Sequence, residues 1–73
     1  MYDLKQIADE LQKTAQGLAY YGNALRVAKD IPGITAGERS VLDAYANGRY
    51  SFEDRIRLQH IALKIKRMGN CII

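Results

Sequence analysis

Cysteine is almost absent from this chain of 73 residues, and its scarcity excludes several kinds of site. With one cysteine, Cys71, the chain forms no internal disulfide, and with one histidine, His60, it cannot assemble a structural zinc site by itself. Cys71 is third from the last residue, whereas a prenylation motif needs its cysteine fourth from the end. We therefore expect a free thiol on a frayed tail and no bound metal.

Long apolar runs are absent as well. No stretch approaches the roughly 18 consecutive apolar residues of a membrane span, and residues 1–5 lack the basic-then-apolar pattern of a signal peptide. Apolar residues nevertheless make up 48% of the chain and charged residues 26%, which is typical of a folded protein rather than a disordered one. The sequence therefore predicts a single small domain in the cytoplasm, without a membrane partner.

Strand signals are missing too, because no stretch alternates apolar and polar residues. We expect an all-α fold of three helices. They cover about residues 3–29, 36–46 and 52–68, with a tail over 69–73. Their lengths favour a long N-terminal helix with the two shorter helices folded back along it, a helical bundle that dimerisation completes.

Helix-capping residues define the boundaries after the first helix. Thr35 and Glu38 are spaced as in a capping box, in which each side chain accepts a hydrogen bond from the other residue's backbone. Asn47-Gly48 provides a left-handed stop for the second helix. Ser51 is the expected cap of the third helix.

An apolar seven-residue repeat runs through residues 4–28 without losing its phase. Gly17 and Gly22 each cost a helix about 1 kcal/mol relative to alanine and could divide it in two. Because the repeat keeps its phase across both glycines, we expect one continuous helix. Its seam and a second apolar strip on the third helix exceed what one layer can cover, which predicts a homodimer or higher oligomer. The residues predicted at that interface are Leu11, Leu18, Tyr21, Leu25, Phe52, Ile56 and Leu63.

No residue cluster specifies a reaction. His60 falls on the polar side of the third helix, and the sequence places no nucleophile beside it. Glu53 and Asp54 are explained by the preference for acids in the first turn of a helix. No phosphate-binding glycine motif is present. We expect a protein that is not an enzyme and that uses no cofactor.

Tyrosine and arginine, which are enriched at binding hot spots, are the strongest surface signal. The chain has five tyrosines, and its net charge of +3 comes from the last third, which favours an acidic partner surface. The residues predicted to contact a partner protein are Tyr20, Arg49, Tyr50 and Arg57. We expect a small binding protein that occupies a surface of its partner, a mode of action common among phage and mobile-element inhibitors and regulators.

A small DNA-binding regulator is the alternative function. The stretch from Ile34 to Leu42, followed by Ala46-Asn47-Gly48, resembles the opening of response-regulator helix-turn-helix domains, which implies that the third helix contacts DNA. The resemblance ends before that helix, whose start at Phe52-Glu53-Asp54 would repel phosphate. The residues predicted to contact nucleic acid are Arg55, Arg57, Lys64, Lys66 and Arg67.

Overall fold

Helices form all the regular secondary structure of residues 3–70, the part of the chain that the computed structural model describes. The elements are α1 (Leu4–Ala15), α2 (Gly22–Ala28), α3 (Ala36–Ala46) and α4 (Phe52–Asn70). The predicted all-α fold is confirmed. The second predicted helix matches α3, and the third matches α4, which extends two residues further than predicted. Cys71 lies outside the described residues.

The prediction of one continuous helix over 3–29 is wrong, because the chain turns after Ala15. Gly17 has a φ of 76°, the left-handed conformation that glycine adopts without a steric penalty. Around it, the Leu18 N–H donates to the Lys13 carbonyl at 3.0 Å and the Gly17 N–H donates to the Thr14 carbonyl at 3.2 Å. These two bonds form a Schellman motif, which ends α1.

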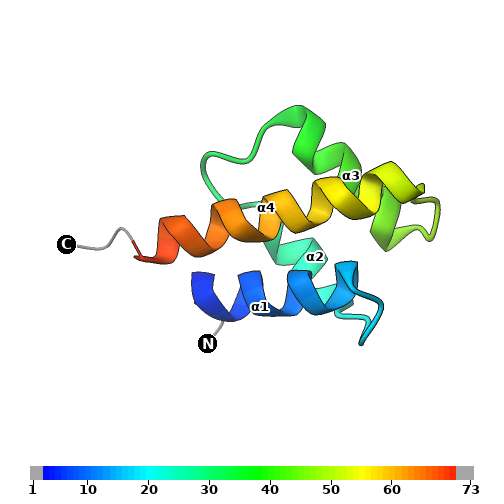
Figure 1. Ribbon diagram of the computed structural model, residues 1–73. Helices are drawn as coiled ribbons and strands as arrows, with labels where there is room; N and C mark the ends of the chain where they lie inside the picture. Colours follow the sequence, from blue (N-terminus) through cyan, green and yellow to red (C-terminus); the bar gives the residue numbers. More distant parts are fainter. Residues whose placement is uncertain (1–2, 71–73) are drawn as a thin grey trace.

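The longest helix, α4, lies antiparallel to α1 (Figure 1). At one end, a Cβ placed on Gly69 would be only 3.1 Å from the Leu4 Cβ, so the two backbones approach as closely as a glycine allows. At the other end, the Arg55 Nε donates to the Ala15 carbonyl at 2.6 Å. Contacts at both ends therefore hold α1 and α4 together. Helix α2 packs against α1 and α3, and α3 also packs against α4.

All four helices contribute side chains to one core. The largest fully buried side chains are Leu11, Leu25, Leu42, Leu58 and Ile65. Because α2 folds back, Leu11 and Leu25 are covered within the monomer, so these two residues of the predicted oligomer interface are not available to a second copy. Leu18, predicted in the same seam, is instead 72% exposed, because it follows the glycine that ends α1.

One lysine joins α4 to the start of α3. The Lys64 Nζ donates to the Gly33 carbonyl at 2.7 Å and to the Glu38 Oε1 at 2.8 Å. The same Glu38 oxygen accepts from the Thr35 N–H, and the Thr35 hydroxyl accepts from the Glu38 N–H, which confirms the predicted capping box. Burial disfavours the charged form of Glu38, but hydrogen bonds from Lys64 and Thr35 outweigh it and lower the Glu38 pKa below its ordinary value.

Candidate protein-binding surface

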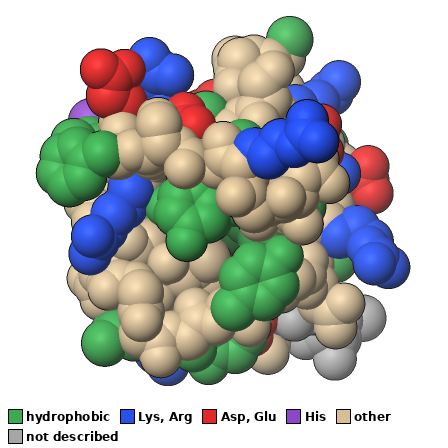
Figure 2. Space-filling view, turned by 90° about the vertical axis from the view of Figure 1, so that its right-hand side faces the viewer, with side chains coloured by type: hydrophobic (Ala, Val, Ile, Leu, Met, Phe, Trp, Pro, Cys, Tyr) green, Lys and Arg blue, Asp and Glu red, His purple; other side chains and the backbone are tan. Residues whose placement is uncertain are grey.

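Two loops, 16–21 and 47–51, meet at one end of the molecule and expose apolar and aromatic side chains there (Figure 2). We call this region the end surface. It consists of the exposed residues Leu18, Tyr20, Arg49 and Tyr50. Between the loops lies a hollow of about 230 Å³. Its lining residues are Thr14, Gly17, Ala19, Tyr20, Tyr45 and Tyr50.

The loop 47–51 is closed by the same backbone motif as the loop 16–21. Gly48 has a φ of 72°, and its N–H donates to the Tyr45 carbonyl at 3.2 Å. The Arg49 N–H donates to the Ala44 carbonyl at 2.8 Å. These bonds complete a second Schellman motif, as Asn47-Gly48 predicts, and they place Arg49 and Tyr50 beside the hollow.

A pair of stacked tyrosines forms one wall of the hollow. The rings of Tyr45 and Tyr50 are parallel within 2°, with their centroids 4.1 Å apart. Tyr50 is exposed, whereas Tyr45 is only 3% exposed and its hydroxyl has no hydrogen-bond partner among the described residues. Burial raises the pKa of Tyr45, so the hydroxyl stays protonated at neutral pH. The wall therefore contains a buried donor without an acceptor, which costs stability.

Tyr20 connects the two loops. Its hydroxyl donates to the Ala46 carbonyl over a long 3.5 Å, and its ring lies against the start of α2, where a Cβ on Gly22 would be 3.3 Å from the Tyr20 Cε2. Of the residues predicted to bind a partner, Tyr20 and Tyr50 thus line the same hollow, and Arg49 is on the loop beside it.

Arg57, the fourth predicted partner-binding residue, lies elsewhere. It is on α4, where its guanidinium is 3.4 Å from Asp54 and 3.7 Å from Glu53. With His60 it lines a separate groove between α4 and the start of α3. Sequence reasoning assigns Leu18 to the oligomer interface and not to the partner-binding residues, and it does not name Tyr45 in any site. The sequence signal that could have predicted the exposure of Leu18 is its position directly after Gly17, the glycine that ends α1.

The basic side chains of α4 do not form one free surface. Arg55 donates to the Ala15 carbonyl at 2.6 Å and to the Gln16 carbonyl at 3.3 Å, where it caps the C-terminus of α1. Lys64 is bound to Glu38, and Arg57 is paired as described above. Within residues 3–70, Lys66 and Arg67 make no ion pair. Three of the five residues predicted to contact nucleic acid are therefore engaged within the molecule.

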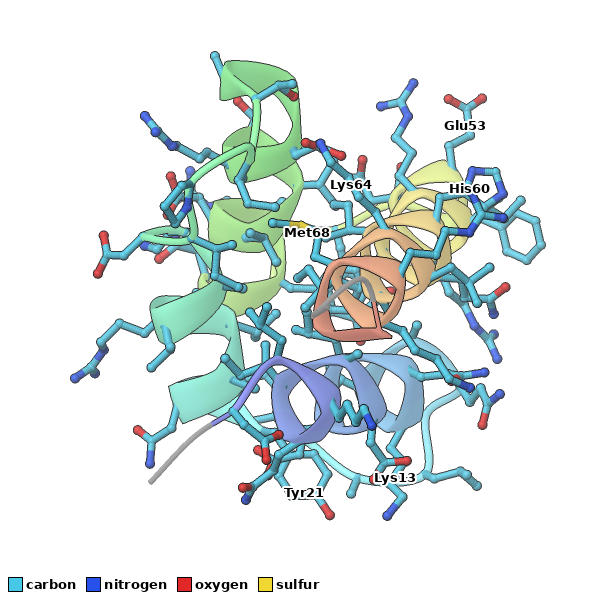
Figure 3. The ribbon with its side chains drawn as sticks, turned by 90° about the vertical axis from the view of Figure 1, so that its left-hand side faces the viewer. Lys13, Tyr21, Glu53, His60, Lys64 and Met68 are labelled. Carbon is cyan, nitrogen blue, oxygen red and sulfur yellow. The ribbon has the colours of Figure 1, made fainter. Side chains whose placement is uncertain are left out.

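The other residues of the predicted oligomer interface differ in exposure. Tyr21 is half-buried and packs against the core. Phe52, Ile56 and Leu63 are exposed, with Phe52 at 73%. They share the outer side of α4 with Glu53 and His60, and Figure 3 shows these two side chains pointing away from the other helices. This strip is the part of the predicted interface that stays uncovered.

Comparisons of the chain with protein-family models, with curated proteins and with solved structures give no match. Among residues 3–70, no group of three or more histidine, cysteine or acidic side chains is arranged to hold a metal ion. No helix in this part of the chain has both the length and the apolar character needed to cross a bilayer.

Proposed function

We propose that this protein binds another protein through the end surface. The observation that supports the proposal is that exposed Tyr20 and Tyr50 line one hollow, and that exposed Leu18 lies on the same loop as Tyr20. Tyrosines at the centre of a contact and an arginine beside them are the typical composition of a binding hot spot. Single exposed apolar residues need no explanation, but a cluster around a hollow does.

The charge beside the hollow favours a partner that presents a carboxylate. Arg49, on the adjacent loop, adds a positive charge that favours an acidic partner. The protein would act by covering the partner's surface, as an inhibitor or a regulator does, and no bond would be made or broken.

The test is a pull-down with the wild-type chain, identification of the captured protein, and titration of that purified protein against variants. Leu18→Glu and Tyr20→Ala should each weaken binding by roughly 30-fold, the cost of truncating an anchor of about 2 kcal/mol. Because Leu18 is exposed, Leu18→Glu should change the free energy of unfolding by less than about 0.5 kcal/mol. Tyr20→Ala also removes the hydrogen bond to the Ala46 carbonyl, so it should cost up to about 1 kcal/mol. Arg39→Ala, an exposed substitution on α3, is the control and should change neither quantity. Unchanged affinity in both loop variants would refute the proposal.

DNA binding by α4 is the second candidate, which the unpaired Lys66 and Arg67 favour. It predicts a steep fall in DNA affinity with salt and loss of binding when both residues are changed to glutamate. In that case Tyr20→Ala should have little effect. The two functions are therefore distinguished by the same set of variants.

We also propose that the chain self-associates through the exposed strip of α4 rather than through the N-terminal seam. Phe52, Ile56 and Leu63 are the large apolar side chains that this helix leaves exposed. Burying them against a second copy would remove their apolar surface from water. Sedimentation velocity should show a dimer that Ile56→Asp converts to monomer.

A further inference from the structure

The outer face of α4 carries a stripe whose two ends have opposite charge. Its residues follow one another at intervals of four, four, three and four, so they share one side of the helix. The α4 stripe consists of Phe52, Ile56, His60, Leu63 and Arg67, all exposed. Glu53 flanks its first turn, and Figure 3 shows Glu53 and His60 pointing away from α1 and α3. The stripe is therefore flanked by an acid at its start, carries apolar residues on both sides of His60, and ends in a basic residue.

We propose that two copies of the chain pair through the α4 stripe in an antiparallel arrangement, with the two-fold axis beside His60. This inference rests on the self-association proposed above and specifies its geometry. An axis at that position brings Ile56 opposite Leu63 of the second copy, and the symmetry repeats the contact. Both apolar residues of the middle turns then pack against an apolar residue.

The charges of Glu53 and Arg67 favour the antiparallel arrangement over the parallel one. In the antiparallel pair, Glu53 lies beside Arg67 of the second copy, and this contact also occurs twice. In a parallel pair, Glu53 would face Glu53 and Arg67 would face Arg67, which is unfavourable. Both charges are available, because Glu53 makes only a 3.7 Å pair with Arg57, and Arg67 makes no ion pair within residues 3–70.

The same charges disfavour other occupants of the stripe. An acidic helix or a nucleic acid that lay along it would be attracted by Arg67 but repelled by Glu53. Lys64, which stands at the edge of the stripe, is already bound to Glu38 and to the Gly33 carbonyl. A second copy is the partner that matches both ends at once.

Charge reversal at the two ends tests the register. In sedimentation velocity at concentrations up to about 1 mM, Glu53→Arg and Arg67→Glu should each weaken the dimer by about tenfold or more, because each places like charges opposite one another twice. Mixing the two variants in equal amounts should restore the dimer, because both contacts of the mixed dimer are then complementary. Lys66→Glu, next to Arg67 but off the stripe, is the control and should leave the dimer unchanged. Circular dichroism verifies that every variant is folded.

The outcomes separate the geometry from the self-association itself. Weakening by each single variant, together with rescue in the mixture, supports the antiparallel pair. In a parallel pair, like charges already face one another in the wild type, so the single variants would not weaken it further. A dimer that Ile56→Asp disrupts, but whose charge variants are not rescued by mixing, overturns the register and leaves self-association standing. A wild-type chain that stays monomeric up to about 1 mM overturns both. Equal weakening by Lys66→Glu would show an effect of net charge and would also overturn the register.

Discussion

Replacing Gly17 by alanine should destabilise the protein by about 1–2 kcal/mol, the cost of holding an ordinary L-residue in the left-handed conformation. The cost comes from the backbone alone, because a Cβ at this position would have nothing within 4 Å, whereas the φ of 76° is unfavourable for alanine. If α1 continued unbroken through residue 17, the same substitution would stabilise the protein by about 1 kcal/mol, because alanine is the better helix former. The sign of the change in the free energy of unfolding therefore shows whether the chain turns at Gly17.

The measurement is urea unfolding, followed by far-ultraviolet circular dichroism, with the thermal midpoint as a second reading. A loss of 1–2 kcal/mol should lower the midpoint by about 4 °C or more in a domain of this size. Gly37→Ala is the matched control. Gly37 lies within α3 without a positive φ, and a Cβ there would meet the Thr35 Oγ1 at 3.9 Å, an ordinary contact. This control should be stabilised by up to about 1 kcal/mol.

Gly17→Asn provides an intermediate case, because asparagine tolerates the left-handed conformation better than alanine does. The expected order of stability is glycine, then asparagine, then alanine. If Gly17→Ala were as stable as the wild type or more stable, while Gly37→Ala behaved as expected, the turn after α1 would be refuted.

Three further substitutions test contacts of the fold and of the end surface. Arg55→Gln should lower the free energy of unfolding by about 1 kcal/mol, because the carbonyls that end α1 lose a charged donor, whereas the exposed Arg57→Gln should change it by less than about 0.5 kcal/mol; equal effects would argue against the cap. Glu38 has a lowered pKa, so its contribution to stability is present above the ordinary glutamate pKa and is lost as the pH falls through the lowered value. Unfolding measured between neutral and acidic pH should show this loss in the wild type and a smaller loss in Glu38→Gln. Tyr45→Phe should raise the free energy of unfolding by up to about 1 kcal/mol, because it removes an unpartnered buried hydroxyl; a loss of stability in urea unfolding would show that the hydroxyl has a partner.

The boundaries of α3 could be predicted from sequence because the interactions that set them are local. Thr35 and Glu38 cap the helix within one turn, and Asn47-Gly48 ends it within two residues. Gly17 ends α1 by the same motif, but it follows Gln16 rather than an asparagine, and the apolar repeat continues beyond it. A repeat shows which side chains face the core, and both α1 and α2 face the same core. Periodicity therefore could not show that the chain turns.

The candidate site could be predicted only in part, because its residues come together through tertiary structure. The exposure of Tyr20 and Tyr50 follows from their positions in the sequence pattern, but their approach depends on the turn at Gly17. Arg55 has the composition of a nucleic-acid contact, and its role as a cap on α1 depends on a carbonyl 40 residues away. Long-range pairings of this kind leave no periodic signal in a chain of this length.

The two Schellman motifs at the end surface also bear on the entropy of binding. Gly17 and Gly48 fix the backbone of both loops in the unbound chain, so binding of the proposed partner would not have to order these loops, and its entropic cost would be limited to a few side chains. Neither glycine would place a Cβ within 4 Å of another atom. A substitution at Gly48 should therefore lower the affinity for the proposed partner, because it loosens the loop that carries Tyr50. It would do so without changing any side chain in the contact.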